Sequence, residues 1–192
     1  MAGYAKQHIA NTLQDMLHDT SLDQIKVSDL IEQSGVNRKT FYYHFHGMED
    51  VLIYIIKTDT DKMPLTGADF SDWDVKIGHF IRYLQEKHLL IRSIYFSSYS
   101  DSIRAYLKGI LYSNIVPFVY NCLAFYETTI GKSLNAKPDN LDTITGFLTS
   151  GIWPIIDEWV KRNYPYPVEK IVDLIDKLTN NNIFNMFEAF YL

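Results

Sequence analysis

Apolar residues recur at helical spacing along most of this chain. Near the N-terminus, Ile9, Leu13, Met16 and Leu17 follow the i, i+4, i+7, i+8 pattern that lines one face of an amphipathic helix. Turn-forming residues then interrupt the pattern at positions 20–24. A first helix that ends near residue 17 is therefore predicted.

Two short helices separated by a tight turn are predicted next. Residues 27–34 form a short helix that Gly35 ends, because glycine readily adopts the left-handed conformation found at helix C-termini. Asn37 is a favourable N-cap for a second helix over residues 38–45. Two helices joined by a glycine-containing turn are the construction of a helix-turn-helix.

The second short helix has an apolar side and a polar side. Phe41 and Phe45 lie at i, i+4 and are expected to turn inward onto the preceding helices. The helix that follows, over about residues 49–60, begins with acidic residues, which suit a helix N-terminus. The first sixty residues thus form a small helical unit.

The rest of the chain is also predicted to be helical. Proline, glycine, serine and aspartate gather at residues 61–72, which predicts a linker to a larger C-terminal unit. No segment shows convincing strand alternation, so the predicted fold class is all-α. Further helices are predicted over residues 72–88, 100–133, 141–162 and 167–192, with Pro117 and Pro154 inside two of them.

Composition supports a folded protein in a reducing compartment. With 47% hydrophobic residues, a chain of 192 residues can bury a substantial core. The single cysteine, Cys122, excludes a disulfide framework and a cysteine-based zinc site within one chain, and points to the cytoplasm. Neither the apolar run of a signal peptide nor a stretch of eighteen apolar residues is present, so no membrane span is expected.

Charge argues against a diffuse attraction to nucleic acid. The chain carries 18 Lys and Arg against 23 Asp and Glu, a net charge of −5, whereas a polyanion-binding protein usually has a basic excess. Residues 1–60 contain five basic and eight acidic side chains. Any contact with DNA must therefore depend on individually placed cations.

The stretch GVNRKTFYYHF, residues 35–45, concentrates such groups. Arginine forks onto guanine O6 and N7, lysine donates to the same acceptors, and threonine offers a hydroxyl and a methyl group. Tyrosine and histidine donate to phosphate oxygens. The residues suited to base edges are Arg38, Lys39 and Thr40, and those suited to phosphate are Tyr42, Tyr43 and His44.

Two other interpretations of this stretch stay open on the residues alone. One is a packed aromatic corner with no ligand. The other is a metal site at the H-x-H pair His44 and His46, although side chains two positions apart diverge on a helix and no carboxylate at useful spacing completes the site. The acids at 59–61 and 69–74 lack the glycine and terminal glutamate of a calcium loop, and read better as a solvated linker.

The segment VSDLIEQSGVNRKTFYYHFHGMEDVLIYII resembles the N-terminal signature of TetR-type transcription regulators, and the match covers about residues 5–56. The segment GFLTSGIWPIIDEWVKRNYPYPVEKIVDLI is more loosely similar to a subgroup related to dihydroxyacetone-kinase regulators. The resemblance implies an all-α homodimer with two domains. They are a helix-turn-helix DNA-binding domain, residues 1–47, and an effector-binding and dimerisation domain, residues 48–192, which contains a connecting helix (48–60) and the linker (61–72).

The resemblance also assigns individual positions. Met48 stands where the family often has lysine, so one phosphate contact is expected to be absent. Lys26 stands where threonine or serine commonly caps the second helix; either Ser28 compensates or Lys26 itself reaches phosphate. The positions carried over for base contacts are Arg38, Lys39 and Thr40, and those for phosphate are Asn37, Tyr42, Tyr43 and His44.

Aromatic residues concentrate in the C-terminal region, where they line an effector cavity or form ordinary core. The residues predicted for the pocket are Phe80, Tyr83, Tyr95, Tyr99, Tyr106, Phe118, Asn121 and Phe125. The apolar faces of the last two helices are expected to form an isologous four-helix interface between two copies. The residues predicted for this interface are Gly151, Ile152, Ile155, Trp159, Ile171, Leu174, Ile175 and Leu178.

No motif organises an active site: a glycine-rich phosphate loop, a nucleophile elbow and a zinc-protease helix are all lacking. Neither an enzyme nor a cofactor nor a metal site is expected. The sequence predicts a ligand-responsive repressor that binds a pseudo-palindromic double-stranded DNA operator as a homodimer and answers to a small-molecule or protein effector. The alternative is a dimeric interaction module, a co-regulator or activator that works through a protein partner with weak or lost DNA binding.

Overall fold

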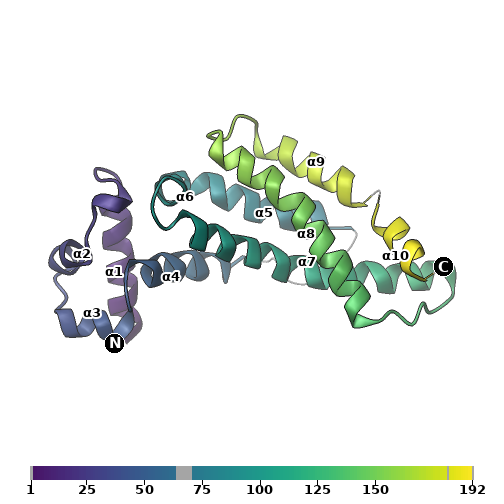
Figure 1. Cartoon of the computed structure of the whole chain (residues 1–192), viewed down its shortest axis with the longest axis horizontal. Helices are drawn as coiled ribbons and strands as arrows, with labels where there is room; N and C mark the ends of the chain where they lie inside the picture. Colours follow the sequence, from purple (N-terminus) through teal and green to yellow (C-terminus); the bar gives the residue numbers. More distant parts are fainter. Residues whose placement is uncertain (1, 64–70, 181, 192) are drawn as a thin grey trace. The chain divides into compact units, whose positions relative to one another are not determined.

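A computed structural model describes residues 2–63, 71–180 and 182–191. Over these ranges the regular secondary structure is entirely helical, which confirms the all-α class (Figure 1). Most of the predicted linker at 61–72 lies outside the described residues. The helices are α1 (Ala2–Met16), the 3-10 helix η1 (Leu22–Gln24), α2 (Val27–Ser34), α3 (Arg38–His44), α4 (Met48–Thr60), α5 (Trp73–Glu86), α6 (His88–Tyr95), α7 (Ser100–Ile130), α8 (Pro138–Lys161), α9 (Val168–Asn180) and α10 (Ile183–Tyr191).

The chain divides into two compact units. Unit 1 combines residues 1–63 with residues 87–106, and unit 2 combines residues 64–86 with residues 107–192. Packing therefore groups a central segment of the sequence with the first helices. The functional division at residue 47, expected from the family resemblance, stays a prediction.

Helix α1 organises the core of unit 1 by packing on α2 and α4 (Figure 1). Ile9 and Leu13 of α1 are fully buried, as their spacing predicts, together with Leu30 of α2 and Leu52 of α4. Burial of an aliphatic side chain of this size contributes about 1.5–3 kcal/mol. The amphipathic pattern of the first helices thus identifies the core of unit 1.

Two polar contacts attach the central segment of unit 1 to its first helices. The carboxylate of Asp23, in η1, accepts hydrogen bonds from the backbone N–H of Ser98 at 3.0 Å and from its hydroxyl at 2.9 Å. The ammonium of Lys87 lies 3.2 Å from Asp59 Oδ2 and donates to Gln14 Oε1 at 3.3 Å. The hydrogen-bonded partners are more than seventy residues apart, so no local sequence pattern predicts these contacts.

Unit 2 is built around α5, α8 and α9, and α5 lies along α9 (Figure 1). Trp73, at the start of α5, is buried and stacks on Phe118 of α7 with ring centroids 4.2 Å apart. After α8, the Tyr164 hydroxyl donates to the Leu84 carbonyl of α5 at 2.9 Å. These contacts join the helices of unit 2 across long stretches of sequence.

The prediction of one helix over residues 167–192 was wrong. Helix α9 ends at Asn180 and α10 begins at Ile183. Asparagine is a poor helix former because its side chain competes for backbone hydrogen bonds. The Asn182 amide illustrates this competition, because it donates to the Leu178 carbonyl at 2.8 Å.

Candidate nucleic-acid interface

The turn before α3 has the geometry that the sequence predicts. Gly35 adopts φ +65°, in the left-handed region, and its N–H donates to the Glu32 carbonyl at 3.1 Å. The Asn37 side chain accepts a hydrogen bond from the Thr40 N–H at 2.7 Å. The predicted C-cap of α2 and N-cap of α3 are both confirmed.

The start of α2 is stabilised by an acidic residue. The Asp29 carboxylate accepts from the Lys26 backbone N–H at 3.1 Å and from the Ser28 hydroxyl at 3.1 Å. Ser28 takes part only through its hydrogen bond to Asp29, the residue that accepts from the helix start, so its partial compensation for the missing cap stays a prediction. The ammonium of Lys26 forms no ion pair within the described part of the chain, and stays available for phosphate.

Helix α3 is held to unit 1 by its apolar side. Phe41 is 0% exposed and Phe45 is 3% exposed, so both face inward as predicted. Their ring centroids lie 5.9 Å apart, and the Phe45 ring also meets Tyr54 of α4 at 5.6 Å. One buried ring on this helix of seven residues and a second at its C-cap fix which side faces solvent.

Most of the predicted DNA-binding residues reach the surface of α3, whereas Thr40 and His44 are half-buried. Arg38 and Lys39 are exposed, Tyr43 is 81% exposed and Tyr42 is 44% exposed. The Tyr43 ring meets the His44 ring edge-on at 4.9 Å. The seven residues predicted for DNA contact all lie on α3 or at its cap: Asn37, Arg38, Lys39, Thr40, Tyr42, Tyr43 and His44.

The start of α4 carries no cation. Met48 is 3% exposed and belongs to the core. The Asp50 carboxylate accepts from the His46 N–H at 2.7 Å, which leaves a negative group at this helix terminus. The phosphate contact that the family often makes through lysine at this position has no equivalent side chain in Met48.

The cations of the first sixty residues differ in their partners. Lys57 lies 2.8 Å from Asp61, and the hydrogen bond to this carboxylate raises the pKa of the lysine. The other four form no ion pair in the described ranges; they are Lys6, Lys26, Arg38 and Lys39. Lys6 was missed from the sequence: its ammonium lies 5.8 Å from the Phe45 ring centroid and 5.6 Å from that of Tyr54. This contact links α1 to α3 and α4, and no spacing rule predicts it.

Two other features, a metal site and a membrane-spanning helix, are absent from the described ranges. No group of three or more His, Cys, Asp or Glu side chains is placed to hold a metal ion there. Within the same ranges, no helix combines the length and the apolar character that a membrane crossing requires. Cys122 is buried on α7.

The residues predicted for an effector pocket are divided between the two units. Tyr95, Tyr99 and Tyr106 belong to unit 1, and the other five belong to unit 2. Phe80, Tyr83 and Phe118 are buried, whereas Asn121 is half-buried and Phe125 is exposed. Phe80 borders a cavity of about 10 Å³ that it shares with Trp73 and Leu111. Such a space holds about one water molecule.

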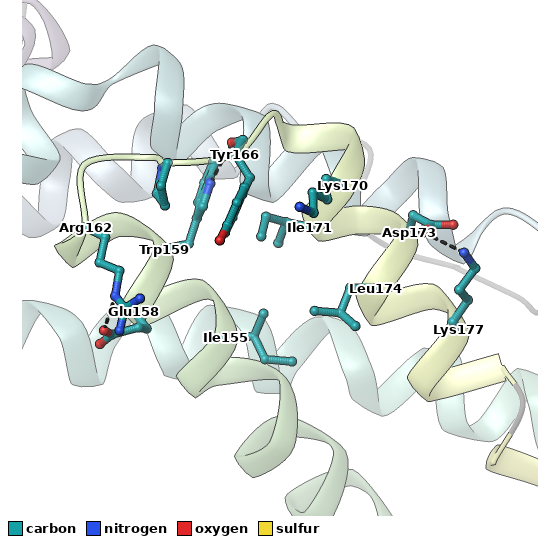
Figure 2. A pocket seen from close by; sticks show the side chains of 11 residues that line it. Ile155, Glu158, Trp159, Arg162, Tyr166, Lys170, Ile171, Asp173, Leu174 and Lys177 are labelled. Atoms are coloured by element: carbon teal, nitrogen blue, oxygen red, sulfur yellow. Dashed lines mark hydrogen bonds and ion pairs between the residues drawn. The ribbon is translucent and has the colours of Figure 1, made fainter.

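Larger hollows lie on the surface formed by the last three helices. Figure 2 shows Ile155 of α8 facing Leu174 of α9, with Trp159 and Tyr166 at one end. This α8–α9 groove has a volume of about 480 Å³. A second hollow of about 500 Å³, the α8–α10 groove, is bordered by Phe147, Gly151, Ile152, Ile155, Leu178, Met186 and other residues of α8 to α10.

The two grooves contain most of the predicted dimer interface. Seven of the eight predicted residues border one or both of them: Gly151, Ile152, Ile155, Trp159, Ile171, Leu174 and Leu178. Ile175 is fully buried within the chain. Ion pairs flank the α8–α9 groove, with Glu158 paired to Arg162 at 2.6 Å and Asp173 to Lys177 at 2.7 Å (Figure 2). An apolar centre with a charged rim is typical of protein–protein interfaces.

Comparison with known proteins identifies the family. A TetR model described as "Transcriptional regulator C-terminal region" matches residues 71–181, more than half of the chain. The HTH-type dhaKLM operon transcriptional activator DhaS of Lactococcus lactis subsp. lactis (strain IL1403) is 28% identical over 87 residues, which are 45% of this chain and 46% of that protein. The match therefore spans less than half the length of that relative.

A solved structure shares the fold. The dihydroxyacetone kinase operon activator DhaS superposes with a TM-score of 0.57, covering 97% of this chain and 96% of that chain at 18% identity. The family match extends over most of unit 2, while the helix-turn-helix geometry and the exposed cations of α3 belong to unit 1. The chain belongs to the TetR family of transcriptional regulators, which are not enzymes.

Proposed function

We propose that this chain binds a pseudo-palindromic DNA operator as a homodimer and regulates transcription from it. The observation that carries the proposal is the two-sided character of α3. Phe41 and Phe45 hold the helix to unit 1, while Arg38 and Lys39 project from it without ion-pair partners in the described ranges. A helix with this arrangement can enter a major groove.

The side chains of α3 suit two kinds of contact. Arg38 and Lys39 can donate to base edges in the major groove, and the Thr40 hydroxyl can donate or accept. The tyrosine hydroxyls, the histidine imidazole and the asparagine amide of this segment can donate to phosphate oxygens on either side of the groove. The residues proposed for phosphate are Asn37, Tyr42, Tyr43 and His44.

A second copy of the chain is proposed to cover the α8–α9 and α8–α10 grooves. Both are bordered by apolar side chains, including the exposed Phe147, Leu174 and Leu178. The same face on two copies makes an isologous interface with two-fold symmetry. Because this symmetry duplicates α3, the operator should contain two related half-sites.

DNA binding is tested on the fragment upstream of the gene for this protein. Wild type should shift the fragment at low salt, and Arg38→Ala combined with Lys39→Ala should abolish specific binding. The control variant is Lys57→Ala, which should bind DNA like wild type because Lys57 is already paired with Asp61. If wild-type protein retards no fragment at low salt, the DNA-binding proposal is refuted.

The salt dependence of binding gives a second test. Four unpaired cations per copy, in the first sixty residues, set an upper limit on phosphates neutralised through that segment. A dimer that uses all of them should give a slope of log K against log salt near −7. A much steeper slope would require cations from outside this segment.

The direction of regulation is proposed from the relatives. The sequence led to the expectation of a repressor, but the Lactococcus relative and the solved structure are both described as activators. Activation of a nearby operon is therefore the favoured mode. Deleting the gene should lower expression of a reporter fused to the bound promoter, whereas a rise in expression would indicate repression.

We propose that the effector is a protein that contacts this chain, in preference to a small molecule held in a preformed pocket. Small-molecule sites usually have about 300–1,000 Å³, and the cavity beside Phe80 has about 10 Å³. The buried Met48 and the acidic start of α4 also favour the alternative of a dimeric module that depends on a protein partner. Activation that needs a second protein, with weak DNA binding by this chain alone, would support that alternative.

A further inference from the structure

We propose that Tyr42 orients the guanidinium of Arg38 toward a guanine and so determines the base preference of α3. This inference rests on the proposed function, because it concerns how the same helix recognises its operator. It gives Tyr42 a positioning role in place of the phosphate contact suggested by the sequence. The chemical group recognised is the O6 and N7 edge of a guanine in each half-site.

Arg38 and Tyr42 form a cation–π pair on the exposed side of α3. They lie one helical turn apart, at i, i+4, where side chains of a helix meet. The guanidinium carbon of Arg38 is 5.5 Å from the centroid of the Tyr42 ring. This distance lies within the range over which a cation is attracted to an aromatic face.

The Tyr42 ring is itself restrained by the core. The ring of Phe41, which is fully buried, meets it edge-on with centroids 5.3 Å apart and an interplanar angle of 83°. A close-packed core side chain has little freedom to move, so this contact limits the orientations of the Tyr42 ring. The Asn37 cap holds the backbone on the other side of Arg38. The buried Phe41 thus restrains the Tyr42 ring, and the Tyr42 ring in turn restrains the exposed Arg38.

A cation–π contact is compatible with hydrogen bonds from the guanidinium to a base. Its five N–H donors lie in the plane of the group, so a guanidinium that turns its face to the ring keeps these donors free. An arginine that lies on Tyr42 can therefore present two parallel N–H groups to guanine O6 and N7. Restricting the side chain beforehand lowers the entropy cost of forming these bonds.

The neighbouring cation provides the contrast. Lys39 has no hydrogen bond, ion pair or ring contact that holds its ammonium within the described part of the chain. Its flexible point charge suits phosphate, so this inference gives Lys39 a phosphate contact in place of the base contact proposed above. Of the two cations, only Arg38 is restrained by a contact with a neighbouring ring, and base recognition needs such a restrained donor.

The test uses the full chain and a pool of randomised DNA duplexes. Selection by the wild-type protein should yield a preferred sequence, which is then compared with duplexes that carry each single base-pair change. If no sequence is enriched at low salt, the proposed function and this inference both fail. If a sequence is enriched, the variants below decide the role of Tyr42 alone.

Four variants separate orientation of Arg38 from phosphate binding. Arg38→Ala should reduce the preference for one guanine per half-site by about 10- to 100-fold. Tyr42→Leu should reduce the same preference by about two- to fivefold, the value of an exposed cation–π contact. Tyr42→Phe keeps the ring and should stay within about twofold of wild type. Adding Tyr42→Leu to Arg38→Ala should cause no further loss, because the ring acts through the guanidinium.

Tyr43→Leu is the matched contrast. The Tyr43 ring contacts His44 and its hydroxyl is proposed for phosphate, so this variant should weaken binding to all duplexes alike and leave the ratio between them unchanged. The proposal is overturned if Tyr42→Leu weakens binding to all duplexes equally, as loss of a phosphate contact would, or leaves the preference intact. Should Tyr42→Leu lack a native circular dichroism spectrum, Arg38→Lys takes its place. That variant keeps the charge and loses the planar fork, so full retention of the guanine preference would also overturn the proposal.

Discussion

Helix α3 and the α8–α9 groove both expose aromatic or apolar side chains, and they differ in the charges beside them. On α3, the exposed Tyr42 and Tyr43 share the surface with Arg38 and Lys39, which form no ion pairs in the described ranges. In the groove, the exposed Leu174 lies between ion pairs that neighbouring residues make with one another.

This difference indicates the kind of partner that each surface suits. Cations without carboxylate partners can meet phosphate at little cost, because no existing ion pair has to break. Around the groove, two of the three cations are paired with carboxylates, and the third, Lys170, lies 4.0 Å from the Tyr166 ring centroid. The apolar centre of the groove gains free energy from burial against another apolar surface. An exposed aromatic side chain therefore does not by itself indicate whether a surface binds DNA or protein; the charges around it are needed as well.

The largest expected effect tests how α3 is held. Replacing the fully buried Phe41 by alanine should lower the free energy of unfolding by about 3–5 kcal/mol, because it leaves a cavity beneath α3. Urea denaturation followed by circular dichroism measures this loss. The exposed Tyr43→Ala variant is the control and should stay within about 0.5 kcal/mol of wild type. Similar losses in both variants would show that α3 does not pack as described.

The next effect tests the groove. Leu174→Glu would place a carboxylate in the apolar centre of the proposed interface and should weaken dimerisation by about 3 kcal/mol, a loss of about 100-fold. Sedimentation equilibrium measures the dissociation constant. Val75→Glu, at an exposed position of α5 outside both grooves, should leave it unchanged. A wild-type protein that is monomeric at micromolar concentration would refute the dimer, and an unaffected Leu174→Glu dimer would place the interface elsewhere.

A smaller effect separates the two roles of Asn37 at the start of α3. Asn37→Ala should cost about 1 kcal/mol of stability, because the Thr40 N–H loses its acceptor. Asn37→Asp keeps the cap but introduces a negative charge, so it should retain stability and weaken DNA binding. Thermal unfolding and fluorescence anisotropy with operator DNA measure the two properties. Unchanged DNA affinity in Asn37→Asp would remove this position from the phosphate contacts.

The smallest effect concerns unit 2 and its dependence on pH. Burial, followed by the nearby Asp74 and Asp173, raises the pKa of Asp176, while Asn180 and Lys177 oppose the shift. A raised folded-state pKa contributes stability that is fully present below the ordinary pKa of aspartate and is lost as pH rises through the raised value. Asp176→Asn should therefore stabilise the protein at pH 7, by less than about 1 kcal/mol because the carboxyl is partly solvated.

Chemical denaturation at pH 7 and pH 4 measures this difference, which should shrink at the lower pH. The exposed Asp142→Asn on α8 is the control and should change stability by less than about 0.5 kcal/mol at both values. If Asp176→Asn destabilises the protein at pH 7, the carboxylate makes a favourable contact that outweighs its burial.

The chemistry of α3 was largely predictable from the sequence. The Gly35 turn, the Asn37 cap and the inward faces of Phe41 and Phe45 depend on residues at most four positions apart. Spacing rules describe such short distances well. The break between α9 and α10 was less predictable, because the helical pattern of apolar residues continues across it.

The sequence could not assign the effector-pocket and interface residues in the same way. A buried aromatic residue and a pocket-lining one have the same composition and spacing, so the sequence could not tell whether Phe80 and Phe118 pack or bind. The structure places both in the core of unit 2, where the cavity beside Phe80 has about 10 Å³. It also separates the groove-lining Leu174 from the buried Ile175, which are adjacent in sequence.

The sequence by itself determined the helical class, the turn and cap of α3, and the family resemblance, because all of these follow from local spacing and residue type. Only the tertiary structure decided which cations lack partners, where Lys6 lies relative to Phe45, and which apolar residues line the grooves. These properties depend on groups that are distant along the chain. Their distances and burial arise only when the helices pack, and packing is a property of the whole unit.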